Sequence, residues 1–165
     1  MRTRFGGENC AIARSLEILG DWWTLLLVRE AFFGTRRFAD FEASLDISKN
    51  VLTRRLGHLV EHGILARVDA GVHGQRYEYE LTPMGKDLLA VLTALRQWGD
   101  RWLFGAGREP LLVLDARTGR PIPRVRLLAE DGRPLRAGDV AVRPGPGASR
   151  ATLARFRRQG GPGRA

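Results

Sequence analysis

The amino-acid sequence predicts an α+β fold that is mainly α, and three observations lead to this prediction. Apolar residues recur at helical spacing along most of residues 8–62. Two short strand-like runs then flank a glycine-containing turn at residues 71–75, and helical spacing returns after Pro83. Together these changes of period predict four helices, a two-stranded hairpin and one further long helix.

The first two predicted helices are separated by a glycine and an aspartate. Residues 8–19 carry apolar side chains at spacings of three and four, and Gly20 ends this run. Asp21 is suited to cap the next helix, at residues 22–33, whose apolar residues lie nearly all round it. We therefore expect this second helix to be buried on most sides.

A short helix and a longer one follow, joined by a tight turn. The short helix covers residues 38–45 and the turn covers residues 46–48. Ser48 is expected to cap the longer helix, which runs to about His62, with Gly63 as the residue after its C-cap. Two helices joined by so short a turn indicate a helix-turn-helix.

The hairpin and the last helix complete the domain. Residues 64–69 and 76–81 are the two strands. Thr82 as N-cap and Pro83 in the first turn then open a helix that reaches about Phe104. This order of elements predicts a winged helix-turn-helix domain at residues 1–104, with a C-terminal dimerisation helix.

The composition shifts to arginine, proline and glycine from residue 105 onward. Short strand-like runs, separated by two turns that contain glycine, predict a small ribbon-like β extension at residues 105–148, without metal ligands. Residues 149–165 are too polar and glycine-rich to fold alone, so we expect a basic disordered tail. Residues 105–165 hold 13 arginines and 5 acidic residues, which account for most of the net charge of +9 and suggest a polyanionic partner.

One face of the predicted helix 48–62 carries polar side chains, and its opposite face is apolar. Leu52, Leu56 and Leu59 form its inner side, and Asn50 and Arg54 lie opposite. Arginine pairs bidentately with guanine in the major groove, and asparagine does so with adenine. The alternative is an ordinary solvated helix face, but the turn before it and the hairpin after it favour double-stranded DNA as the partner.

Further basic and polar residues are expected to hold the phosphate backbone or to lie on the wing. The complete set of expected DNA-binding residues is Arg36, Arg37, Ser48, Lys49, Asn50, Thr53, Arg54, Arg55, His73, Gln75 and Arg76. For Arg76 the alternative is a structural ion pair with a nearby acid such as Glu78 or Glu61.

The last helix has an apolar seam with spacings of 4, 3, 4, 3 and 4, which begins at Met84. Such a heptad-like seam favours a homodimer. The alternative is a core face within one chain, but a second apolar stripe at Leu89, Leu92 and Leu103 is more than one small domain would bury. The expected dimer-interface residues are Leu88, Val91, Leu95, Trp98 and Trp102.

An enzyme is the competing class, and no motif supports it. The sequence has no phosphate-binding loop, and its histidines offer only the His58 and His62 pair at i, i+4. We expect no catalytic residues, no metal and no cofactor. With no apolar run long enough for a membrane span and no secretory signal, we expect a cytoplasmic protein that does not interact with membranes.

Ordered matches through residues 10–104 make the sequence resemble the HxlR family of bacterial winged-helix regulators, which is distantly similar to the MarR group. The matching residues are Cys10, Leu19 to Trp23, Leu26, Leu27, Arg29, Glu30, Arg37, Phe38, Phe41, Ile47, Ser48, Leu52, Thr53, Leu56, Gly63 to Leu65, Arg76 to Tyr79, Leu81, Thr82 and Gly85. The resemblance implies a homodimer on a palindromic operator. It departs at Gly57, where a long polar side chain is more usual.

The resemblance also implies what kind of chemical signal the protein responds to. Several HxlR-like proteins sense oxidants or electrophiles with a cysteine at the place of Cys10, which would lie in the first turn of a helix with Arg14 one turn on. The alternative is a packed, inert cysteine. Some relatives carry a zinc-ribbon extension, but here the turns at residues 118–119 and 131–132 have no cysteine.

The sequence thus predicts a DNA-binding transcriptional regulator whose signal is an oxidant, an electrophile or a small-molecule effector. The alternative function is a winged-helix module that binds proteins without binding specific DNA.

Overall fold

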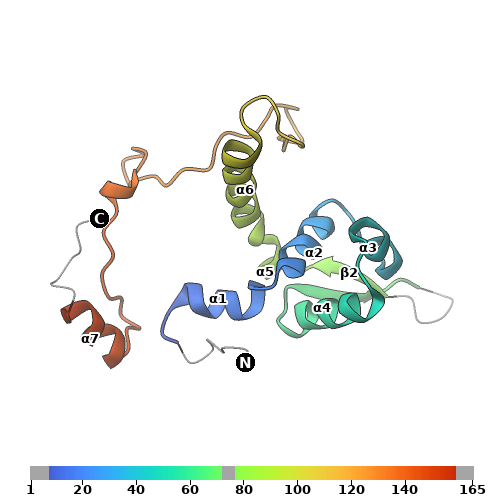
Figure 1. Cartoon of the computed structure of the whole chain (residues 1–165), viewed down its shortest axis with the longest axis horizontal. Helices are drawn as coiled ribbons and strands as arrows, with labels where there is room; N and C mark the ends of the chain where they lie inside the picture. The colour runs from blue at the N-terminus through green and yellow to red at the C-terminus, as the bar shows by residue number, and fades with distance from the viewer. Residues whose placement is uncertain (1–7, 72–76, 159–165) are drawn as a thin grey trace. The chain divides into compact units, whose positions relative to one another are not determined.

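The structure is a computed structural model that describes residues 8–71 and 77–158 of the chain (Figure 1). It contains two compact units. One is Ser15–Ile122, and the other combines Met1–Arg14 with Pro123–Ala165. Among the described residues, no helix has both the length and the apolar composition that crossing a membrane requires.

Four helices form the first part of the chain, and their bounds are close to those predicted. They are α1 Ala11–Leu19, α2 Trp22–Phe32, α3 Phe38–Leu45 and α4 Lys49–Glu61. The Asp21 carboxylate accepts the backbone N–H of Trp23 at 3.1 Å, so the predicted cap of α2 is confirmed. Ser48 is the N-cap residue of α4, as predicted, but its side chain makes no capping hydrogen bond.

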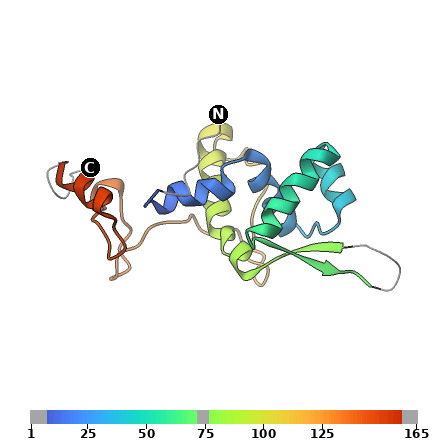
Figure 2. The same cartoon turned by 90° about the horizontal axis from the view of Figure 1, so that it is seen from below.

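Strands β1 Leu65–Asp69 and β2 Tyr77–Leu81 pair antiparallel, with Leu65 opposite Leu81 and Asp69 opposite Tyr77. They run as one ribbon beside α4 (Figure 2). The backbone N–H of Tyr79 also donates to the carbonyl of Arg36 at 2.8 Å, which ties the start of α3 to the hairpin. The predicted order of helices and hairpin, and with it the winged helix-turn-helix, is confirmed.

The core lies where α2, α3 and α4 meet the hairpin, and α2 contacts all of the others. Its buried apolar residues are Leu27, Val28, Phe41, Ile47, Leu52, Leu56, Leu59, Ile64, Leu65 and Tyr79. The rings of Phe41 and Tyr79 meet edge to face at 6.3 Å. The expectation that α2 is buried on most sides is only partly right, because Trp22 at its start is 76% exposed.

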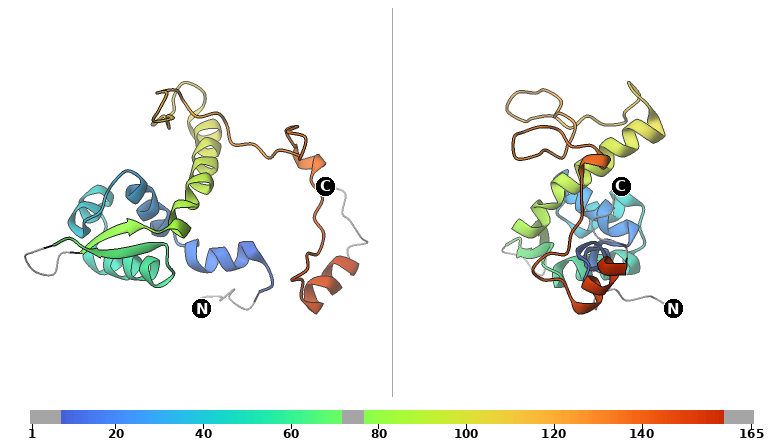
Figure 3. Two further views of the ribbon diagram at one scale, coloured as in Figure 1. Left: turned by 180° about the vertical axis from the view of Figure 1, so that it is seen from behind. Right: turned by 90° about the vertical axis from the view of Figure 1, so that its left-hand side faces the viewer.

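The last helix of the domain is interrupted, although we expected one helix to Phe104. The structure has α5 Pro83–Lys86, then α6 Leu88–Gly99, then a π-helical turn η1 Asp100–Phe104. The predicted cap is present, because Thr82 Oγ1 accepts the N–H of Gly85 at 3.1 Å. Thr82 Oγ1 also donates to the carbonyl of Gly63, so α5 is fixed to the base of the hairpin, and α6 rises from there (Figure 3).

The extension contains turns and isolated bridges. Leu114 pairs with Pro121 in the first unit, and Leu128 pairs with Pro134 in the second. The backbone N–H of Arg117 donates to Asp115 and thereby lowers the pKa of that carboxyl group. In place of extended strands, the extension thus has two tight turns, and a 3₁₀ turn η2 Ala137–Asp139 follows.

Helix α7, Arg150–Arg158, occupies part of the segment that we expected to be disordered. Its first turn has two capping partners. Ser149 Oγ accepts the N–H of Thr152 at 3.1 Å, and Asn9 Oδ1 accepts the N–H of Ser149 at 2.8 Å. These bonds satisfy donors at the helix start that would otherwise face water, which explains order in so polar a segment.

Candidate nucleic-acid interface

The outward side of α4 presents the predicted reading face. Lys49, Asn50, Thr53 and Arg54 are all exposed, whereas Leu52, Leu56 and Leu59 on the other side are completely buried. Within the described residues, no ion pair or side-chain hydrogen bond is recorded for Lys49, Asn50 or Arg54. The face therefore offers unpaired donors in the first two turns of the second helix of the pair, where base edges are reached.

Arg55 does not belong to this face, contrary to the prediction. Its Nη2 lies 2.5 Å from Oδ2 of Asp21, and its side chain is only 13% exposed. The neighbouring position on a helix points about 100° away, and this rotation turns Arg55 toward the start of α2. Its role in the structure is to hold α4 against α2.

Arg36 and Arg37 lie where they were predicted, and both already have acidic partners on β2. Arg36 pairs with Glu80, and Arg37 Nε lies 3.1 Å from Glu78. Both arginine side chains remain more than half exposed. Because exposed ion pairs contribute about 0–1 kcal/mol, a phosphate can replace either carboxylate at little cost.

The wing has one basic residue that the sequence reasoning missed. Arg67, exposed on β1, lies over the rings of Tyr77 and Tyr79 at 5.9 Å and 5.8 Å. Its place within the predicted first strand of the hairpin, residues 64–69, was the available signal. The predicted wing residues His73, Gln75 and Arg76 lie outside the described residues.

Most side chains of the predicted dimer seam are exposed to solvent in the single chain. Val91, Leu95, Trp98 and Trp102 are each at least 50% exposed. Leu88 differs, because it is partly buried and packs against the core of its own chain. Other large apolar residues are exposed too, on α1 and at the start of α2: Ile12, Leu16 and Trp22.

An apolar cavity of about 600 Å³ lies between α2 and α6 within the first unit, and Leu95 of the predicted dimer seam is one of its lining residues. Residues 110–113 form another part of its wall. Arg96 holds that segment, since its Nη1 donates to the carbonyl of Leu111 at 3.0 Å and to Asp100 at 2.7 Å. The Nε of Arg96 is buried and has no hydrogen-bond partner within residues 8–71 and 77–158.

Cys10 is a free, exposed thiol. Its carbonyl accepts the N–H of Arg14 at 3.0 Å, so Cys10 precedes the first helical residue, Ala11. It thus lies one position before the first turn in which it was expected. Its exposure does not support the alternative of a packed cysteine.

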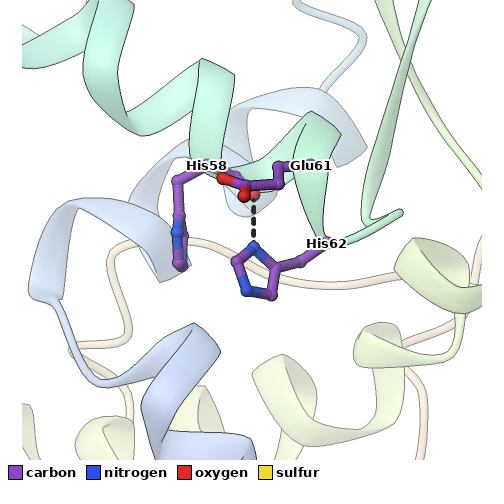
Figure 4. Close-up of side chains that lie close together, drawn as sticks. All are labelled: His58, Glu61 and His62. Carbon is purple, nitrogen blue, oxygen red and sulfur yellow. Dashed lines mark hydrogen bonds between the residues drawn. The ribbon is translucent and has the colours of Figure 1, made fainter. Parts of the chain in front are cut away.

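One group of metal-ligating side chains occurs at the C-terminal end of α4 (Figure 4). From the sequence we expected no metal at His58 and His62, whose spacing of i, i+4 was the only one that the histidines offered. The structure brings Glu61 to the pair: one ligand atom from each of the three residues lies within 4.8 Å of the others.

Comparison with known proteins gives consistent matches. Residues 18–105 match a family described as HxlR-like helix-turn-helix. The HTH-type transcriptional regulator Rv3095 of Mycobacterium tuberculosis, itself uncharacterised, is 39% identical over 144 residues, which are 87% of this chain and 90% of that protein. The uncharacterised HTH-type regulator YvaP of Bacillus subtilis is 33% identical over 91 residues, which are 54% of this chain and 84% of YvaP.

Solved structures agree. The candidate transcription factor PA1607 has a TM-score of 0.81 at 40% identity, covering 87% of this chain and 100% of that one. PA1374 of Pseudomonas aeruginosa has a TM-score of 0.64 at 40% identity, covering 88% and 99%. The redox regulator HypR in its reduced form reaches 0.50 at 27% identity, covering 57% and 93%.

Proposed function

The chain belongs to the HxlR-like helix-turn-helix family of DNA-binding transcriptional regulators, and we propose that it binds a palindromic operator as a homodimer. Asn50 and Arg54, which are exposed on α4 and have no side-chain partner among the described residues, carry this proposal. Each can form two hydrogen bonds with one base, which is the arrangement that discriminates among base pairs.

Phosphate contacts surround this reading face in the proposed complex. Lys49 lies beside it on the first turn of α4, and the exposed guanidinium groups of Arg36 and Arg37 extend the basic surface toward the hairpin. Arg67 adds a cation on the wing, where His73, Gln75 and Arg76 are also proposed to bind. These residues position the protein without choosing a sequence.

The homodimer uses α6. Leu95 and Trp98 are about half exposed in the single chain, and burying the exposed half of each contributes roughly 1 kcal/mol. A two-fold dimer places two copies of α4 in successive major grooves. The half-sites should then be centred about 10 base pairs apart, or a multiple of that distance.

The test is selection of binding sites from randomised DNA with the wild type, Arg54→Ala and Lys49→Ala. We expect Arg54→Ala to relax one base pair in each half-site, with a loss of about 1–3 kcal/mol, whereas Lys49→Ala weakens all sequences alike. Base reading by Arg54 is refuted if its alanine variant selects the full wild-type motif. The absence of an inverted repeat would refute the two-fold dimer.

A protein-binding module without DNA specificity is the alternative function. Gel shifts at increasing salt separate the two, because binding to phosphate weakens linearly with the logarithm of salt concentration. A specific complex that survives competitor DNA and shows this salt dependence supports operator binding. No shifted complex at low salt would favour the protein-binding module.

We further propose that Cys10 senses oxidants. It is exposed, and HypR, which shares the fold, is a redox regulator. Since the chain has one cysteine, oxidation gives an intermolecular or mixed disulfide, or a sulfur acid. Diamide should therefore change operator affinity in the wild type but not in Cys10→Ser. Equal responses of the two proteins would refute sensing at this thiol.

A small apolar effector is proposed for the cavity between α2 and α6. Its volume is within the usual range for ligand sites, and α2 packs on both helices of the DNA-binding pair. The fluorescent probe N-phenyl-1-naphthylamine should bind the wild type. Gly99→Phe, at the cavity wall, should weaken its binding, and Ala90→Phe on an exposed face of α6 should not. Equal binding to both variants would refute this site.

A further inference from the structure

The cluster at the end of α4 has three donors from one short stretch of helix. His58, Glu61 and His62 are spaced i, i+3 and i+4, so all three side chains share one side of the last turn. A ring nitrogen of each histidine and an oxygen of the carboxylate lie within 4.8 Å of one another (Figure 4). Two nitrogens and a carboxylate oxygen form a donor set that suits zinc.

Backbone carbonyls orient both rings. His58 Nε2 lies 3.0 Å from the carbonyl of Ile18 on α1, and a carbonyl can only accept a hydrogen bond. In the neutral ring, Nε2 therefore carries the proton, and Nδ1 keeps its lone pair. His62 Nδ1 lies 2.9 Å from the carbonyl of His58, which leaves the lone pair on His62 Nε2.

This pattern is the one that metal-binding histidines show. A ligating imidazole donates its other N–H to a carbonyl or carboxylate, which fixes the tautomer and the ring orientation. Here both rings satisfy that condition without a metal. The rings lie close together, with centroids 4.2 Å apart and planes inclined at 45°. The exposed Glu61 side chain is free to rotate toward them.

We propose that His58 Nδ1, His62 Nε2 and the Glu61 carboxylate bind one Zn²⁺ ion per chain. Ligand bonds of about 2.0–2.2 Å require the three side chains to rotate so that these two nitrogens and the carboxylate face one ion, and water fills the fourth position. Because His58 also holds the Ile18 carbonyl, bound zinc stabilises the end of α4 and its contact with α1. The proposal of this zinc site does not rest on operator binding.

The experiment uses the full chain, without an affinity tag, after removal of metals by a chelator. Co²⁺ serves as the visible probe, and Zn²⁺ affinity follows from its displacement of Co²⁺. We expect one Co²⁺ per chain and a loss of affinity of about 10-fold or more in His58→Ala and in His62→Ala. Glu61→Gln should weaken binding less, since its amide oxygen remains a weak ligand.

Two matched controls test the assignment. His73→Ala removes the third histidine of the sequence, and Cys10→Ser removes its thiol. Both should bind Co²⁺ like the wild type. Binding that is absent in the wild type, or that is lost in Cys10→Ser and kept in His62→Ala, overturns the proposal.

A second measurement guards against variants that fold poorly. Ligands that bind the native state raise the midpoint of thermal unfolding. Zn²⁺ should raise this midpoint in the wild type and not in His62→Gln, which keeps a polar side chain at the helix end. An equal rise in both proteins would show that zinc binds elsewhere, and would also refute the site.

Discussion

Replacing Gly85 by alanine should destabilise the fold, although the same exchange in a helix usually stabilises it. Alanine is about 1 kcal/mol more favourable than glycine within a helix. A Cβ atom at position 85, however, would lie 2.2 Å from the carbonyl oxygen of Ile64 and 3.0 Å from Leu81 Cδ2. The first of these distances is far below van der Waals contact, so backbone has to move.

That movement disturbs the junction of the hairpin and α5. The backbone N–H of Thr82 donates to the same Ile64 carbonyl at 3.1 Å. Thr82 Oγ1 accepts the N–H of Gly85 and donates to the carbonyl of Gly63. Overpacking typically costs about 1–3 kcal/mol, and a weakened hydrogen bond costs about 1 kcal/mol. After the gain in helix propensity, we expect Gly85→Ala to lose about 1–3 kcal/mol of the free energy of unfolding.

Gly57→Ala is the matched control. It also lies within a helix, α4, but a Cβ atom there would meet nothing within 4 Å. We expect a gain of about 0.5–1 kcal/mol. Urea unfolding followed by tryptophan fluorescence, at one protein concentration for all variants, measures both changes. If Gly85→Ala is neutral or stabilising like Gly57→Ala, the close approach to Ile64 does not constrain the junction.

Three further predictions concern the dimer, the tail and the pairing of α2 with α4. Leu95→Glu combined with Trp98→Glu should give monomers by light scattering, whereas Ala90→Glu should keep the dimer; an intact dimer in the double variant would place the interface elsewhere. Deleting residues 149–165 should lower the salt dependence of DNA binding without changing base preference, and an unchanged slope would exclude phosphate contacts by this segment. Asp21→Asn keeps a capping side chain but removes the ion pair to α4, so it should lose about 1–2 kcal/mol in urea unfolding, and Asp21→Ala should lose about 1 kcal/mol more. Equal losses in these two variants would contradict the capping role.

Features set by neighbouring residues could be predicted from the sequence. Asp21 before α2, Thr82 and Pro83 before α5, and Gly63 after α4 act within one helical turn, so their effects follow from residue type and position. The outward face of α4 could also be predicted, because the buried leucines fix which side is turned to the core.

Features set by distant residues could not be predicted. Arg55 turns inward because Asp21, 34 positions earlier, lies within its reach. Helix α7 begins where Asn9, 140 positions earlier, accepts the N–H of Ser149. Gly85 approaches the carbonyl oxygen of Ile64, 21 positions earlier, more closely than a Cβ atom would allow. Each depends on how elements pack in three dimensions, which residue spacing does not record.

The Asp21 carboxylate also limits how the protein can respond to a signal. Its Oδ1 accepts the N–H of Trp23, and its Oδ2 holds Arg55, so one rigid group joins the start of α2 to the middle of α4. This shared carboxylate therefore resists a hinge motion of the recognition helix away from α2. In the proposed dimer, a change in the distance between the two protomers' recognition helices leaves these contacts intact. A signal would then act by changing the spacing between the two recognition helices. Operators with half-sites moved apart by one base pair would reverse the effect of that signal on binding.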